Sequence, residues 1–151
     1  MQGPESKLWA WLKNGLKGLW HDVHRIETST ELGYPDVEGC IAGTCFLVEL
    51  KVVHYVRKKC GSFAIEHYTS KQAYVLHKRW ETGGRSWLVI RLAVPNEPVR
   101  HYLIPGREAL LLHDNRLILT RGFLEAVSWP GFESGSALAK KLWQGISGPI
   151  V

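Results

Sequence analysis

Two short motifs place acidic residues and a lysine where they could act together. Pro35-Asp36 follows a Gly-Tyr pair, and Glu49-Leu50-Lys51 follows Asp36 by thirteen residues. The second motif lies in the apolar run CFLVELKVVH, residues 45–54, whose β-branched and aromatic composition predicts a buried strand. Side chains alternate along a strand, so Glu49 and Lys51 share one face. Burying such charges is costly unless they are paired or used.

Residues 36–41 are a plausible partner strand. A tight turn at Ala42-Gly43 would set Asp36 directly opposite Glu49, with Cβ atoms about 5 Å apart. Ala-Gly is a weak two-residue turn signal, so a wider loop with a shifted register stays open. Two close carboxylates repel each other unless a cation lies between them. Oxygen ligands suit Mg²⁺, and a nearby lysine can orient or help deprotonate a water, or neutralise phosphate charge.

The plain alternative is a surface hairpin with an ordinary cross-strand charge pair, because Glu and Lys are usually exposed. Glu38 shares the face of Asp36, and we interpret it as a solvated charge rather than as a supporting acid. The preceding Pro35-Asp36 pair favours a reactive site over the plain hairpin. The flanking segments are Arg25-Ile26-Glu27, Gly33-Tyr34-Pro35-Asp36-Val37, the Glu49–Lys51 strand, and Ser70-Lys71-Gln72 at the start of a helix.

With these flanks the motifs resemble the PD-(D/E)XK nuclease superfamily. The span from Arg25 to Arg91 looks like the small phage nucleases related to the VRR-NUC and endonuclease I (Holliday junction resolvase) groups. The resemblance implies a Mg²⁺ site, with Mn²⁺ able to substitute, and no nucleotide cofactor. The metal ligands that it implies are Asp36, Glu49, the backbone carbonyl of Leu50, and Glu27, directly or through water.

The resemblance also assigns Lys51 to orienting or activating the attacking water, and Gln72 to positioning the site. Without it, Glu27 is an exposed carboxylate at a helix end, and Gln72 is a routine surface residue at a helix start. The resemblance to this superfamily also implies a restriction-endonuclease-like core.

Composition sets the outer limits. The chain has 151 residues, a formal net charge of +5 and a pI near 9.2, which favours one domain and an anionic partner. No apolar stretch has the length of a membrane span and no signal peptide is visible, so we expect a cytoplasmic protein, in the host cytoplasm if phage-encoded. The three cysteines are expected to be reduced thiols, with Cys40 and Cys45 on opposite faces if both are extended.

Basic residues near the motifs are candidates for contacting DNA phosphates. The densest run is VRKKCG, residues 56–61, which either grips the backbone of DNA or only keeps a hairpin tip soluble. We favour the first interpretation because the run directly follows the Glu49–Lys51 strand. The candidates are Arg25, Arg57, Lys58, Lys59, Lys71, Lys78 and Arg79.

Periodicity then predicts the elements that position these residues. An amphipathic helix over residues 5–20 is expected to pack on the sheet or on a second subunit, with a membrane surface as the weaker alternative. Strands are expected over 45–54, 62–68, 86–94 and 99–104, and helices over 71–82, 108–113, 122–127 and 136–144. The strand–helix–strand order from 62 to 94 predicts a parallel pair.

The predicted fold is therefore α/β. One domain, residues 1–151, has a central mixed sheet of four or five strands flanked by helices, with the site at one sheet edge. It comprises an N-terminal helix (5–20), a catalytic core (25–94) and a C-terminal helical part (106–145).

The predicted function is a Mg²⁺-dependent DNA endonuclease, with Holliday junction resolution by a homodimer as the leading substrate hypothesis. A flap-cutting, nicking or general DNA-degrading nuclease is the alternative within that class. Outside it stand a catalytically inactive DNA-binding module of the same fold, and a structural protein with a chance motif.

Overall fold

A mixed five-stranded sheet forms the centre of the molecule. The computed structural model describes residues 3–26, 33–54, 62–129, 138 and 142. Its strands are β1 (His21–Arg25), β2 (Val37–Ile41), β3 (Thr44–His54), β4 (Ser86–Ala93) and β5 (Arg100–Pro105). They lie in the order β1-β2-β3-β4-β5, and every neighbouring pair is antiparallel except the parallel pair β3–β4. The predicted α/β class with a mixed sheet is confirmed.

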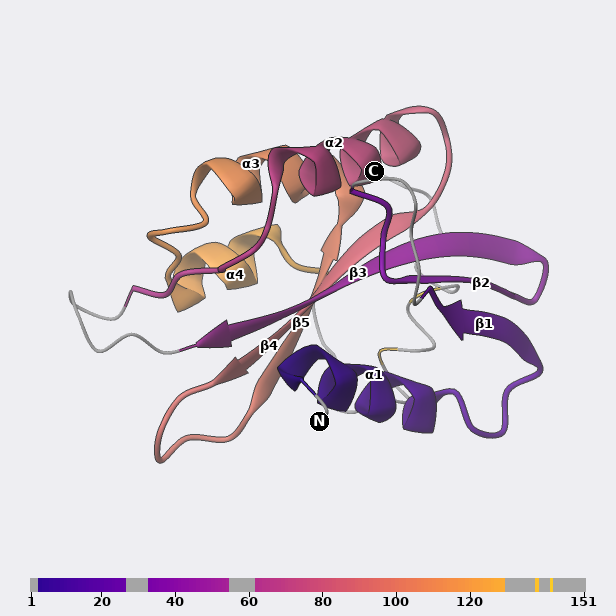
Figure 1. Ribbon diagram of the computed structural model, residues 1–151, viewed down its shortest axis with the longest axis horizontal. Helices are drawn as coiled ribbons and strands as arrows, with labels where there is room; N and C mark the ends of the chain where they lie inside the picture. The colour runs from indigo at the N-terminus through magenta and orange to yellow at the C-terminus, as the bar shows by residue number, and fades with distance from the viewer. Residues whose placement is uncertain (1–2, 27–32, 55–61, 130–137, 139–141, 143–151) are drawn as a thin grey trace.

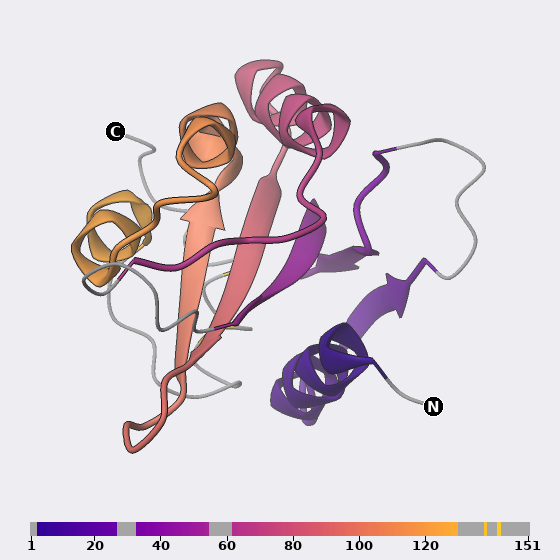
Figure 2. The same ribbon diagram turned by 60° about the vertical axis from the view of Figure 1, so that its left-hand side comes forward.

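Helices cover both faces of the sheet. Helix α1 (Pro4–Gly15) lies on one face, whereas α2 (Ser70–Glu81), α3 (Ala109–Asp114) and α4 (Arg121–Val127) lie on the other (Figures 1 and 2). A short 3₁₀ turn, η1 (Gly106–Glu108), joins β5 to α3. None of the described helices has the length and apolarity needed to cross a membrane.

Helix α1 packs on the sheet through the stripe that its sequence predicts. Leu8, Leu12 and Leu16 are fully buried against that face, because residues three and four apart share one side of a helix. The helix ends at Gly15, so the prediction that it runs to residue 20 is wrong. His21–Arg25 forms an edge strand instead; its pattern was missed because only Val23 of its five residues is buried.

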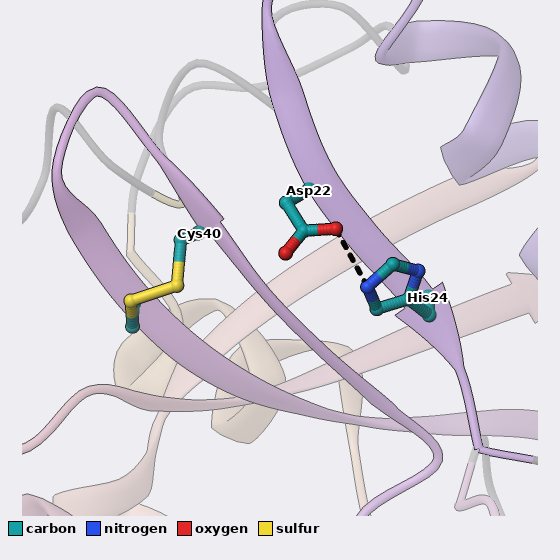
Figure 3. Close-up of a disulfide and its surroundings, with 4 residues drawn as sticks. Asp22, His24 and Cys40 are labelled. Carbon is teal, nitrogen blue, oxygen red and sulfur yellow. Dashed lines mark ion pairs between the residues drawn. A yellow bond between two sulfur atoms is a disulfide. The ribbon is translucent and has the colours of Figure 1, made fainter.

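A two-residue turn joins β2 to β3. Ala42 and Gly43 both have positive φ, 52° and 80°, as the two-residue hairpin turn that matches strand twist requires. The tight register therefore holds, and Cys40 lies directly opposite Cys45. These cysteines form a disulfide, next to the Asp22–His24 ion pair of β1 (Figure 3). The expectations of reduced thiols and opposite faces are wrong, since residues paired across a hairpin point to the same face.

The segment before α2 departs from its prediction. Residues 62–68 alternate in burial, with Phe63 and Ile65 inside, yet they make only an isolated bridge, Phe63 to Leu119. The predicted strand there is wrong, and the parallel pair formed across α2 is β3–β4. Alternating burial shows that one side of an extended segment faces the core, but it does not require that the segment pair with another strand. The basic run 56–61 lies outside the described residues, as does most of the predicted helix 136–144.

Candidate active site

Strand β2 stops one residue short of the site. Its pairing with β3 begins at Val37–Val48, and the same register sets Asp36 opposite Glu49. In the described part of the chain no strand continues beside β3 beyond that point on the β2 side. The site was expected at a sheet edge, but it lies on the central strand, where the end of β2 creates a local edge.

Asp36 occupies the place that the next ladder pair would have filled. Its carboxylate Oδ2 accepts a hydrogen bond of 2.9 Å from the Leu50 N–H. The Asp36 carbonyl accepts another, of 2.7 Å, from the N–H of Ile26 beyond β1. The aspartate is thus tied on both sides, and one carboxylate oxygen caps the free edge of β3.

The backbone of Leu50 faces the same local edge. The Leu47 N–H donates to the Arg85 carbonyl on the β4 side. Successive residues of a strand direct their N–H and C=O groups to alternate sides, so those of Leu50 both lie on the β2 side. The Leu50 carbonyl therefore opens toward the edge on which Asp36 lies.

Glu49 is a buried carboxylate whose two oxygens differ in their contacts with the described residues. It is 1% exposed. Its Oε1 accepts a 2.8 Å hydrogen bond from Gln72 Nε2 and lies 3.2 Å from Lys51 Nζ. Its Oε2 is buried and has no hydrogen-bond partner among the described residues. Burial, and then the charge of Asp36, raises the pKa of Glu49 to about 8, although Lys51 opposes the shift.

Lys51 is buried on the same face as Glu49. Lys51 is 3% exposed. Besides its contact with Glu49, its ammonium donates a hydrogen bond of 3.0 Å to the His67 carbonyl. Glu5 Oε1 lies 4.0 Å away. A buried ammonium needs such partners, since desolvation without them is costly. The lysine is consequently held in one place rather than extended into solvent.

Glu5 was not among the predicted site residues. It belongs to the first turn of α1, which packs on the opposite face of the sheet, yet its Oε1 lies 4.0 Å from Lys51 Nζ. Helical spacing carried a signal, because Glu5 precedes Leu8 by three residues and Leu12 by seven. The apolar stripe of α1 thus points an acid toward the sheet at its N-terminal end.

Gln72 couples α2 to the site through a single amide. Its Oε1 accepts from the Thr69 N–H at 2.9 Å, while its N–H donates to the Thr69 hydroxyl at 3.2 Å, which forms a capping box. The amide nitrogen that remains donates to Glu49. The Gln72 side chain therefore fixes both the start of α2 and the orientation of the Glu49 carboxylate.

The other predicted residues are distributed around this centre. Glu27, Arg57, Lys58 and Lys59 lie outside the described residues. Arg25, at the end of β1, donates to the Ser6 hydroxyl at 3.0 Å. Glu38 is exposed and accepts from the Tyr34 hydroxyl at 2.9 Å, as expected of a solvated charge. The remaining three, Lys71, Lys78 and Arg79, are exposed on α2.

The donor set fits a hard divalent cation. The carboxylates of Asp36 and Glu49 are close enough for the charge of Asp36 to raise the pKa of Glu49, and the Leu50 carbonyl faces the side on which Asp36 lies. The buried Glu49 Oε2, which has no hydrogen-bond partner among the described residues, is a further oxygen donor. Among the described residues no group of three or more His, Cys, Asp or Glu side chains gathers to form a complete cage. Mg²⁺ usually takes one or two carboxylates and fills its other positions with water and phosphate.

Comparison with known proteins gives a distant structural likeness. No family model matches the chain, and no curated protein matches it. Among solved structures, the chain is similar to Hjc, a Holliday junction resolvase from the archaeal hyperthermophile Archaeoglobus fulgidus. The two share 16% identity with a TM-score of 0.40, over 68% of this chain and 76% of that chain.

Proposed function

We propose that this protein is a Mg²⁺-dependent DNA endonuclease that hydrolyses phosphodiester bonds at the local edge beside β3. The observation that carries the proposal is the proximity of Asp36, Glu49 and Lys51, with one buried Glu49 oxygen that has no hydrogen-bond partner among the described residues. A purely structural charge pair would gain stability from partnering this oxygen, because an unpaired buried acceptor is costly.

Each side chain then has a distinct task. Asp36, Glu49 Oε2 and the Leu50 carbonyl hold the metal, which when bound lowers the pKa of water and polarises the phosphate. Gln72 keeps Glu49 Oε1 occupied, which leaves Oε2 as the oxygen available to a metal. Glu5, with Oε1 4.0 Å from the Lys51 ammonium, adds negative charge on that side of the lysine.

Lys51 acts on the nucleophile and on phosphate charge. Its ammonium is anchored by Glu49 and by the His67 carbonyl, and the hydrogen that remains is available for the attacking water or a phosphate oxygen. Such a fixed donor stabilises charge in the transition state without reorganising.

The net charge of +5 and the exposed bases of α2 provide the contacts to DNA. Lys71 packs against Gly33, three residues before Asp36. The two residues are so close that a Cβ added to Gly33 would lie 2.8 Å from the Lys71 Cβ. Phosphate contacts of this kind release counterions, so binding should weaken steeply as salt rises.

A four-way junction is the substrate we favour, cut by a homodimer with Mg²⁺ or Mn²⁺. The resemblance of the Arg25–Arg91 motifs to the endonuclease I group supports it, and paired sites suit two symmetric cuts. Flap cutting, nicking or general degradation of DNA is the alternative within the same chemistry.

The test is cleavage of three labelled DNAs: a four-way junction, a plain duplex and a single strand. Each is incubated with Mg²⁺ or with EDTA, using wild type, Asp36→Asn and Lys51→Ala. We expect paired cuts on the junction with Mg²⁺ alone, no cuts by either variant, and retained junction binding by Lys51→Ala in a gel-shift assay.

The outcomes separate the alternatives. Equal cutting of all three DNAs keeps the nuclease and discards junction specificity. Binding without cutting under any divalent ion points to an inactive DNA-binding module. Full cleavage by Lys51→Ala would remove the role proposed for that lysine.

A further inference from the structure

A left-handed residue lies beside the buried lysine. Among the described residues only three that are not glycine have positive φ: Ala42, His67 and Asn96. Ala42 belongs to the β2–β3 turn, and Asn96 belongs to the turn between β4 and β5. His67, with φ of 58°, lies in a turn over residues 66–67 that joins no two strands of the sheet, so no hairpin sets its conformation.

The His67 carbonyl is one of the close partners of Lys51. It accepts from Lys51 Nζ at 3.0 Å, while Glu49 Oε1 lies 3.2 Å from the same nitrogen. These two acceptors fix the direction of an ammonium whose side chain is 4% exposed. An extended backbone at His67 would turn its carbonyl away from Lys51, because the φ and ψ angles of His67 set the direction of its carbonyl relative to the preceding chain.

The chain on both sides of His67 is firmly tied. The Ile65 N–H donates to the Arg116 carbonyl at 2.7 Å, and the buried Tyr68 hydroxyl donates to the Ala109 carbonyl at 3.0 Å. Thr69 then caps α2. A sparsely populated backbone conformation persists when its surroundings determine it in this way.

The residue His67 is exposed, whereas Lys51, which its carbonyl contacts, is buried. Histidine, asparagine and aspartate enter the left-handed region several times more readily than other residues, and glycine does so freely. The residue type is thus explained by the backbone alone, without chemistry at the imidazole.

We propose that His67 is a positioning residue, whose left-handed backbone aims its carbonyl at Lys51 and so holds that ammonium toward the reacting phosphate. This rests on the proposed nuclease function. The position should accept any residue that tolerates positive φ, and should reject β-branched residues, which do not.

The test compares His67→Asn and His67→Gly with His67→Val. The first two should keep kcat within about threefold, whereas the third should lose on the order of 10²-fold in kcat with unchanged KM for DNA, as expected for a displaced catalytic group. Asn96→Val is the matched control, since it places valine at positive φ in the β4–β5 turn. It should lower Tm but leave kcat unchanged. If His67→Val does not fold, His67→Ala should show the same effect in milder form.

A second readout does not depend on cleavage. The acylation rate of Lys51 by an amine-reactive ester, followed by peptide mass spectrometry, should rise in His67→Val and match wild type in His67→Asn. If wild type cuts no DNA, the nuclease proposal fails while this rate still tests His67. Equal loss of kcat in the Asn and Gly variants would assign the role to the imidazole and overturn the proposal. Unchanged kcat and unchanged acylation in the Val variant would overturn it too.

Discussion

Strand β3 presents two very different faces. Toward α1 it directs Phe46, Val48 and Leu50, all buried among apolar side chains. Toward α2 it directs Glu49 and Lys51, which are buried as deeply but carry charge. One strand therefore separates packing from chemistry simply by alternating its side chains.

The comparison teaches what each face contributes. The α1 face removes apolar surface from water, which stabilises the fold and fixes the strand rigidly. The α2 face buries a carboxylate and an ammonium, which stabilises little by itself. Substitutions on the first face should lower stability and spare chemistry, and those on the second should do the reverse.

The largest expected effect is that of Glu49→Gln. It keeps the shape of the side chain but removes the negative charge that would hold the metal, so kcat should fall by at least about 10³-fold. Tm without metal should change by no more than a few degrees, as about 1 kcal/mol corresponds to roughly 2–4 °C at this size. Glu38→Gln, at an exposed acid of β2, is the control and should cut normally. A fall in Tm of tens of degrees in Glu49→Gln would contradict the separation of the two faces.

The next effect is that of Leu12→Ala on the α1 face. Truncating a fully buried leucine should destabilise the protein by about 2–5 kcal/mol in urea denaturation, through lost burial and a cavity. At a temperature where the variant stays folded, its kcat should lie within about threefold of wild type. A selective loss of kcat in the folded variant would show that α1 contributes to chemistry beyond Glu5.

Gln72→Ala should have a smaller, mixed effect. It removes the amide that orients Glu49 and half of the capping box, so kcat should fall by roughly tenfold and stability by about 1 kcal/mol. Thr69→Ala disturbs the same cap but leaves the Gln72–Glu49 bond, and it should lose similar stability with little loss of kcat. Identical kinetics in the two variants would mean that only the cap matters.

The smallest effect concerns pH on the α1 face. His101 stacks on Trp11 with ring centroids 3.6 Å apart, and burial, followed by the charge of Arg91, lowers its pKa to about 4. The unfolded chain binds the proton near pH 6.5, so stability should be full above that pH and fall as pH drops toward 4. The loss should be on the order of 1 kcal/mol after allowance for partial exposure. His101→Phe, which keeps a stacking ring but cannot titrate, should flatten this part of a pH–stability curve; an unchanged slope would exclude His101 as its source.

The elements with a clear pattern were predictable. The buried positions of residues 70–81 repeat at helical spacing, and residues 86–93 form a nearly continuous apolar run that is buried on both faces of the sheet. Strand β1 was not predictable, since it is held by backbone pairing to β2 and has a single buried side chain. The false strand at 62–68 shows the converse, with alternation but no ladder.

The site was partly predictable because much of it is local. Asp36 and Glu49 face each other through hairpin symmetry, which sequence spacing can reveal. Glu5 and the His67 carbonyl come from segments whose approach depends on tertiary packing, and a carbonyl leaves no trace in residue type. Glu27 stays a prediction, as it lies outside the described residues.

The hairpin of β2 and β3 also limits where insertions and deletions can occur in chains that keep this site. Asp36, Glu49 and Lys51 are separated by a fixed number of paired residues, and the Cys40–Cys45 link closes the tip. A one-residue insertion within a strand reverses every side chain beyond it. Homologous chains that keep this site should therefore confine insertions and deletions to segments outside residues 36–51, or change the hairpin in ways that preserve the Asp36–Glu49 pairing.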